Sequence, residues 1–216
     1  MVWERAKRPS IAVCIPHTGM FYAEFCDRTY VPLKAFVHRL FNKSFFMSSG
    51  LPVNIAREGM VENALRIPEI THIYFQDTDL VPETPPDINE AIASLLSCNI
   101  PIACGLYRAK QKEGFNYAIW TASSDGKKFT PVQGWKGDRF KADVTGLGSA
   151  LIQRQVFEKT PRPWFPWDLG TPSEDFSFYL KAKKAGFDCW IIPSVRFSHL
   201  GNLKVTTQGT VEVQEV

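Results

Sequence analysis

Apolar and polar residues alternate along the chain in two periods, which predict strands and helices in turn. Short apolar runs closed by Pro, Gly, Asp or Arg are typical of strands in the interior of a parallel sheet. These runs lie at residues 10–16, 43–50, 72–77 and 100–108. Apolar residues at helical spacing separate them, at residues 30–41, 54–67 and 85–99. The alternation predicts an α/β fold, a single Rossmann-like domain with a mostly parallel sheet flanked by helices.

The second half of the chain interrupts this alternation and then resumes it. Residues 110–143 break into short, aromatic-rich runs around an Asp125-Gly126 turn, which predicts a small antiparallel hairpin insertion. Its aromatic rings are expected to have one of three roles: to form a small satellite core, to bind the acceptor, or to contact another subunit. Strand and helix signals return at residues 144–159, 174–186 and 189–201. We expect the domain to span residues 1–204, and residues 205–216 to form a C-terminal tail, either an edge hairpin or disordered.

The composition limits the partners that the chain can have. With 216 residues it is long enough for one sizeable core. A net charge of +3 and a pI near 8.6 suit an anionic ligand, but no basic cluster predicts a nucleic-acid partner. No apolar stretch is long enough for a membrane span, and the N-terminus does not read as a signal peptide. Five scattered cysteines without a Cys-x-x-Cys pair indicate reduced thiols. We therefore expect a cytoplasmic protein.

Two aspartates, Asp77 and Asp79, follow the apolar run at residues 72–77. On an extended segment, residues two apart point to the same side, so the two carboxylates repel each other unless a cation lies near them. Mg²⁺ and Mn²⁺ prefer oxygen ligands, and one or two carboxylates are a usual protein contribution. The alternative is an ordinary turn, in which Asp simply ends the strand.

Three further residues carry possible chemistry near the C-terminus. His199 ends the last predicted strand, and an imidazole is an acceptable ligand for Mn²⁺, although a lone His after a strand is also a common surface residue. Glu174 and Asp175 begin a predicted helix, where acidic residues are favoured by the helix dipole. A carboxylate held beside an acceptor hydroxyl would instead serve as a general base.

Six segments, taken in order, resemble the GT-A-fold glycosyltransferases, closest to the family 2 type. They read "IAVCIPHTG", "NIAREGMVENAL", "IYFQDTDLVP", "VTGLGSALIQRQVF", "SEDFSFYLKAKKAGF" and "FSHLG", and together they cover about residues 10–201. The resemblance implies a single GT-A domain that binds a nucleotide-sugar donor and Mn²⁺ or Mg²⁺. It also implies sugar transfer to an acceptor hydroxyl with inversion, the acceptor being a glycan, a protein or a lipid-linked molecule.

The resemblance also implies roles for individual residues. Asp175 would be the base, with Glu174 binding or orienting the acceptor. The metal would be held by Asp77, Asp79 and His199, with Asp77 also close to the ribose. Donor binding would involve Pro16, His17, Thr18, Arg57, Asn63, Gln76 and Asp77. The acceptor side would contain Gly146, Gly148, Trp164 and Trp167, the glycines admitting the sugar and the tryptophans closing over it or anchoring their loop. The chain departs from the family pattern at Glu58, where Asn is usual after Arg.

Other classes share parts of this pattern. "DTDLV" also fits haloacid dehalogenase-like phosphatases, in which the first Asp is a nucleophile, but there the motif follows the first strand. A nucleotidyltransferase would show a basic, Gly-rich loop after the first strand, and "PHTGMFYAEF" contains no basic Lys or Arg. A non-catalytic sugar- or nucleotide-binding module is the third alternative, marked by binding without turnover.

Overall fold

The computed structural model describes residues 8–35, 37–110, 116–167, 170–201, 203–207 and 211–213. Its helices are α1 (Ala23–Phe25), the π-helical turn η1 (Cys26–Tyr30), α2 (Val31–Ala35), α3 (Val53–Leu65), α4 (Ile88–Ser97), α5 (Arg154–Lys159) and α6 (Glu174–Lys184). Its strands are β1 (Ser10–His17), β2 (Asn42–Ser49), β3 (His72–Gln76), β4 (Leu80–Thr84), β5 (Ile102–Leu106), β6 (Ile119–Ala122), β7 (Phe129–Pro131), β8 (Phe140–Ala142), β9 (Val144–Thr145), β10 (Ser149–Gln153), β11 (Cys189–His199), β12 (Leu203–Val205) and β13 (Val211–Val213).

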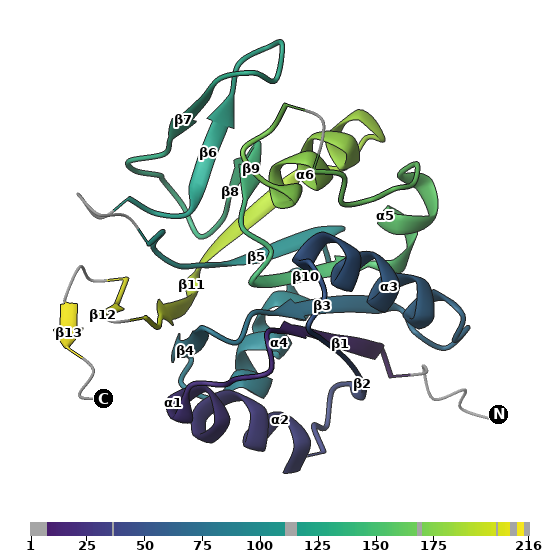
Figure 1. The fold of residues 1–216 in the computed structure, drawn as a ribbon, viewed down its shortest axis with the longest axis vertical. Coiled ribbons are helices and arrows are strands. Elements are labelled where there is room, and N and C mark those ends of the chain that lie inside the picture. The colour runs from purple at the N-terminus through teal and green to yellow at the C-terminus, as the bar shows by residue number, and fades with distance from the viewer. Residues whose placement is uncertain are drawn as a thin grey trace, which may run out of the picture.

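One large sheet organises the molecule, with the strand order β13-β12-β11-β5-β10-β3-β1-β2 (Figure 1). Strand β1 pairs in parallel with β2 and β3, and β11 pairs in parallel with β5. Between these two groups β10 runs antiparallel to both β3 and β5. Strands β2, β1, β3, β5 and β11 therefore run in one direction, and their carboxyl ends share one edge. This confirms the expected mostly parallel sheet.

Both faces of the sheet are covered, and the strands alternate accordingly. In β1, Ala12 and Cys14 pack with residues of α3, α5 and α6, whereas Ile11, Val13 and Ile15 pack with residues of α2 and α4. All five side chains are fully buried. Figure 1 shows the two groups of helices on opposite sides of the sheet. A sheet covered on both faces explains why the strand segments are nearly continuous apolar runs.

The first helical segment lies earlier in the chain than its sequence pattern predicts. The described helical residues run from Ala23 to Ala35, whereas helical spacing was expected over residues 30–41. Phe25, Thr29 and Leu33 are fully buried at four-residue steps, so they supply the inward stripe. The buried face of this helical segment thus begins at Phe25, before residue 30, where the sequence pattern predicted the helix to start.

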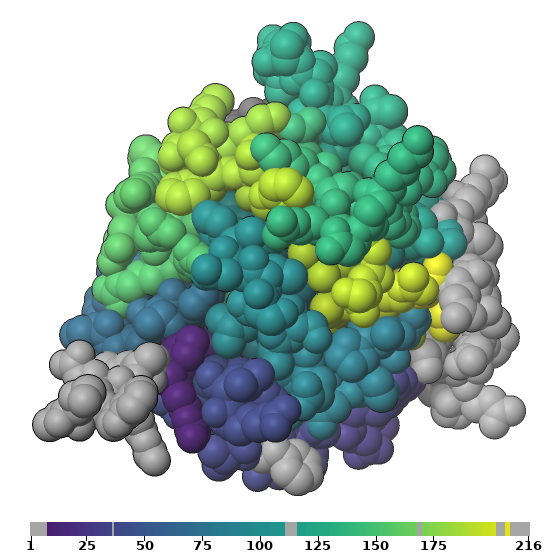
Figure 2. Space-filling model, turned by 180° about the vertical axis from the view of Figure 1, so that it is seen from behind, coloured from purple at the N-terminus to yellow at the C-terminus, as the bar shows by residue number. Residues whose placement is uncertain are grey.

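The predicted hairpin insertion is present as a second, three-stranded antiparallel sheet in the order β7-β6-β9. Trp120 and Phe129 contact Phe176 of α6, with ring centroids 5.0 and 4.7 Å apart. Seen from behind, the hairpin and the segment that follows it border the yellow surface of β11 (Figure 2), where β8 pairs with that strand. The insertion is therefore packed on the main domain.

Near the C-terminus, β12 pairs with β11 and β13 pairs with β12, so the sheet continues past residue 204. Thr207 is buried, and its backbone N–H and hydroxyl both donate to the carboxylate of Glu83. The proposed boundary at residues 204/205 remains a prediction. Of the described helices, none has the length and apolar character needed to cross a membrane.

Candidate functional site

A cleft opens at the carboxyl edge of the sheet, beside the Asp-x-Asp turn. It has a volume of about 230 Å³ and lies between the end of β1, the start of α3 and the turn after β3. Its lining residues are Pro16, His17, Thr18, Leu51, Val53, Arg57, Asp77, Thr78 and Asp79. The structure thus gathers five of the seven residues predicted to bind the donor and two of the three predicted metal ligands, with Asp77 counted in both groups.

Buried hydrogen bonds hold the turn that carries Asp77 and Asp79. Gln76 is fully buried, and its amide nitrogen donates to the carbonyl oxygens of Asp77 at 2.9 Å and Leu80 at 3.0 Å. Its amide oxygen accepts a hydrogen bond from the Tyr74 hydroxyl at 2.8 Å. The backbone N–H of Asp77 donates to the Gly148 carbonyl at 3.0 Å. Gln76 therefore positions the turn and has no surface from which to touch a donor.

Arg57 of α3 lies at the centre of the site. Its guanidinium is buried and donates through one nitrogen to both Glu174 and Asp175. Through its other terminal nitrogen it donates to the two carboxylate oxygens of Asp77, at 2.8 and 3.1 Å. Burial opposes the charge on Arg57, but the three carboxylates outweigh it and raise the pKa of the guanidinium. Arg57 is thus a permanent cation that joins α3, the Asp-x-Asp turn and α6.

Asp79 faces a different pair of residues. One of its carboxylate oxygens lies 2.8 Å from the Lys110 ammonium and 3.2 Å from Nε2 of His199. The Nδ1 atom of His199 lies 2.9 Å from the Arg108 carbonyl, which can only accept, so Nδ1 carries a proton. Burial opposes ionisation of Asp79, but the hydrogen bonds and charges of His199 and Lys110 outweigh it and lower its pKa to about 2. Asp79 is therefore a carboxylate at neutral pH.

The charges of this cluster do not balance. Four carboxylates, those of Asp77, Asp79, Glu174 and Asp175, face the cations Arg57 and Lys110. When all four are ionised, they leave a surplus of two negative charges if His199 is neutral and of one if His199 is protonated on both ring nitrogens. Burial raises the pKa of Asp77. Burial, together with the carboxylates of Glu174 and Asp77, also outweighs Arg57 and raises the pKa of Asp175 to about 8. The cluster therefore requires either bound protons or a further cation.

The donor set fits a divalent ion at Asp79 and His199. A proton lies between Nε2 of His199 and the ionised Asp79 carboxylate, because two lone pairs 3.2 Å apart would repel each other. A divalent ion in place of that proton would meet an oxygen and an imidazole nitrogen, a pair that suits Mn²⁺. Within the described part of the chain, no three His, Cys, Asp or Glu side chains are arranged as a metal-binding group. Both oxygens of Asp77 accept from Arg57, and its predicted role as a metal ligand remains a prediction. Further ligands would have to come from water or substrate.

Asp175 combines a raised pKa with partial exposure, and it is bonded to Arg57 of the cleft without lining the cleft itself. Its side chain is 18% exposed, whereas that of Glu174 is 5% exposed. One oxygen accepts from Arg57 and the other accepts from the backbone N–H of Leu147 at 3.3 Å. The two bonds fix the carboxylate in place, and its exposed edge is available for a proton. Glu174 lies deeper, against Arg57.

The two glycines predicted on the acceptor side, Gly146 and Gly148, are in close contact with protein side chains. A Cβ on Gly146 would lie 2.0 Å from the Tyr107 hydroxyl, and one on Gly148 would lie 2.8 Å from an oxygen of Asp77. The space beside these glycines is thus occupied by protein side chains.

The two tryptophans and Asn63 are outside the cleft. Trp164 is buried and its ring N–H donates to the carbonyls of Phe157 at 2.9 Å and Thr160 at 3.0 Å, which matches the anchoring alternative. Trp167 is 52% exposed and Asn63 is exposed on α3, and neither lines the cleft. Their roles in binding remain predictions.

Sequence reasoning did not select Tyr107 or Lys110, although both follow β5 at the carboxyl edge of the sheet. Tyr107 is buried, and its ring meets His199 edge to face, with centroids 5.8 Å apart. Burial, and the nearby carboxylates of Asp77 and Asp175, raise its pKa well above the usual range. In α/β folds ligands bind at the carboxyl ends of the parallel strands, and β5 is one of these strands. The positions of Tyr107 and Lys110 just after β5 could therefore have indicated both residues from the sequence.

No profile of a known protein family matches the chain, and no curated protein matches it in sequence. Among solved structures, A197 from STIV superposes with a TM-score of 0.67 at 18% identity, over 96% of this chain and 95% of that one. GalNAc-T7, solved with UDP, GalNAc and Mn²⁺, superposes with a TM-score of 0.60 at 12% identity. The fold is GT-A-like. The match covers 89% of this chain but only 43% of the GalNAc-T7 chain, and at these identities the likeness concerns the fold alone.

Proposed function

We propose that the chain is a metal-dependent glycosyltransferase, which moves a sugar from a nucleoside-diphosphate donor to an acceptor hydroxyl with inversion. The observation that carries this proposal is the surplus of negative charge around Arg57 at the edge of the cleft when its carboxylates are ionised. One divalent ion would offset this surplus, and a diphosphate would fill that ion's remaining positions. GalNAc-T7, which shares the fold, was solved with a nucleoside diphosphate and Mn²⁺, and this supports the same pairing here.

Asp79 and His199 would hold the Mn²⁺ or Mg²⁺. When bound, the ion offsets the charge that develops on the leaving diphosphate. Lys110, 2.8 Å from Asp79, adds a second positive charge on the same side. Pro16, His17 and Thr18 form the wall of the cleft at the end of β1, where the nucleoside would lie. Arg57 is already bonded to three carboxylates, so its role is to position Asp77 and Asp175 and not to bind the donor directly.

Asp175 is assigned as the general base. The acceptor oxygen forms a bond to the anomeric carbon while its proton passes to a carboxylate oxygen of Asp175. The bond between that carbon and the diphosphate breaks, and its electron pair leaves with the diphosphate. One displacement from the opposite face inverts the configuration. A pKa near 8 makes Asp175 a stronger base than an ordinary carboxylate, in the range that suits catalysis near neutral pH.

The pH profile of turnover tests this assignment. Asp175 acts as a base only when deprotonated, so kcat/KM for donor consumption should rise with pH and level off above about 8. Asp175→Asn should lower turnover by about 100-fold or more and still bind nucleoside diphosphate. Asp138→Asn, at an exposed aspartate outside the cleft, is the matched control. An unchanged rate in Asp175→Asn, or retained anomeric configuration by NMR, would contradict the mechanism.

The phosphatase alternative is not favoured by the geometry. Its mechanism needs the first aspartate of the motif as a free nucleophile, but both oxygens of Asp77 accept from Arg57. The motif also follows β3, whereas that class carries it after the first strand. A non-catalytic binding module would bind the donor but show no turnover in the same assay.

A further inference from the structure

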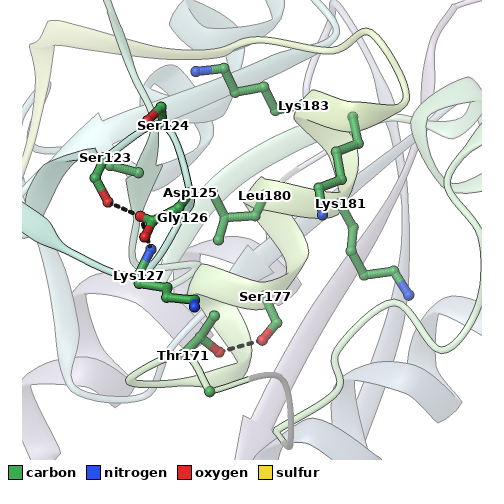
Figure 3. Close-up of a pocket in the computed structure, with 13 residues that line it drawn as sticks. Ser123, Ser124, Asp125, Gly126, Lys127, Thr171, Ser177, Leu180, Lys181 and Lys183 are labelled. Atoms are coloured by element: carbon green, nitrogen blue, oxygen red, sulfur yellow. Dashed lines mark hydrogen bonds between the residues drawn. The ribbon is translucent and has the colours of Figure 1, made fainter.

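A second and larger pocket lies between the turn of the β6–β7 hairpin and α6. Its volume is about 790 Å³, within the range typical of small-ligand sites. The lining residues are Ala122, Ser123, Ser124, Asp125, Gly126, Lys127, Gly170, Thr171, Ser177, Leu180, Lys181, Lys183 and Lys184. Figure 3 shows the hairpin turn facing α6 across the pocket.

This pocket is separate from the donor cleft. The described lining residues of the two have no member in common. Ser177, Leu180, Lys181 and Lys184 form one stripe of α6. Ser177 follows Asp175 by two residues, which is about 200° around a helix, so the stripe faces away from the proposed base.

The walls of the pocket are held in place by their own contacts. Gly126 at the tip of the hairpin approaches Leu180, with 3.6 Å between the Leu180 methyl group and the position of a Cβ on Gly126. At the base of the hairpin, Trp120 and Phe129 pack on Phe176 of α6. On the α6 side, the hydroxyls of Thr171 and Ser177 bond to each other at 2.5 Å (Figure 3). The pocket therefore exists without a ligand to form it.

The pocket is positively charged. Four lysines line it, against one aspartate, Asp125, which accepts from the Ser123 hydroxyl at 2.5 Å and the Lys127 backbone N–H at 3.1 Å within its own turn. Lys183 is paired with Asp143, so the local balance including that residue is +2. Within the described residues Lys127 and Lys184 form no ion pair. Two such ammonium groups on opposite walls attract an anion into the space between them.

The lining chemistry narrows the class of anion. Among the described lining residues there is no aromatic ring on which a nucleobase could stack. Hydroxyl side chains are present instead, with Ser123 and Ser124 on the hairpin and Thr171 and Ser177 on the opposite wall. The volume far exceeds that of a single inorganic ion, and a smaller groove that shares Lys181 and Lys184 continues to Lys159. We propose that this pocket is a binding site for an acidic saccharide, a sugar that carries a carboxylate or a phosphate group.

Binding of small probes to the whole chain tests the proposal. Titrations would use glucuronic acid, glucose 6-phosphate, glucose and inorganic phosphate at low salt. We expect both charged sugars to bind more tightly than glucose and than phosphate, and added salt to weaken them. Lys127→Gln/Lys184→Gln should weaken the charged sugars by about fivefold or more, since each exposed charge pair contributes up to about 1 kcal/mol.

The matched control is Lys128→Gln/Lys136→Gln, which removes two exposed lysines that do not line the pocket. It should change affinity by less than about twofold. Three outcomes would overturn the proposal. They are an equal loss of affinity in both double variants, binding of phosphate as tight as that of glucose 6-phosphate, and no binding of either charged sugar. Asp79→Ala should leave this binding unchanged, so a failure here is distinct from a failure at the donor cleft.

Discussion

At the scale of single residues, Arg57 determines the arrangement of the site because three carboxylates from two other elements depend on it. Arg57→Met would leave those carboxylates buried and uncompensated, which typically costs about 3–5 kcal/mol of unfolding free energy. Without the guanidinium, the folded-state pKa values of Asp77 and Asp175, which are already raised, rise further above their unfolded values near 4. The folded state then holds protons that the unfolded state has lost, so the loss of stability grows as pH rises from about 4 towards 8.

Urea unfolding at pH 5.5 and pH 8 measures this effect. Arg66→Met, at an exposed arginine that caps the same helix, is the control and should change stability by less than about 0.5 kcal/mol. If Arg57→Met lowers the free energy of unfolding by less than about 1 kcal/mol at pH 8, Arg57 does not stabilise the buried carboxylates.

At the scale of elements, the segment that leads into β10 is shaped by Gly146, against which the Tyr107 hydroxyl packs. Gly146→Ala would place a methyl group 2.0 Å from that hydroxyl, and overpacking of this kind costs about 1–3 kcal/mol. Tyr107→Phe removes the oxygen and leaves the nearest ring carbon at 3.2 Å, so the double variant should recover part of the lost stability. Thermal unfolding of the single and double variants measures the coupling.

Gly134→Ala is the control for this series, because nothing lies within 4 Å of its Cβ position. Strictly additive effects of Gly146→Ala and Tyr107→Phe would contradict the steric account.

At the scale of the whole molecule, local periodicity was enough to predict the layered α/β architecture, because a sheet covered on both faces leaves a strong apolar signal. It did not predict β4, since the prolines that follow Asp79 are typical of a turn. That strand forms by pairing with β11, more than 100 residues away, and such pairing leaves no local pattern. Proximity to strand ends indicated Asp77, Asp79 and His199. It did not indicate that both carboxylate oxygens of Asp77 accept hydrogen bonds from Arg57.

The central claim is that the negative cluster holds a divalent ion that in turn holds a nucleoside diphosphate. Calorimetric titration of a panel of nucleoside diphosphates, with and without Mn²⁺, tests it on the native chain, on Asp79→Ala and on the exposed control Asp138→Ala. We expect one nucleotide to bind at least about tenfold more tightly with Mn²⁺, a gain of about 1.4 kcal/mol, in the native chain and the control only. Binding that is equally tight without Mn²⁺, or unchanged in Asp79→Ala, would contradict the account.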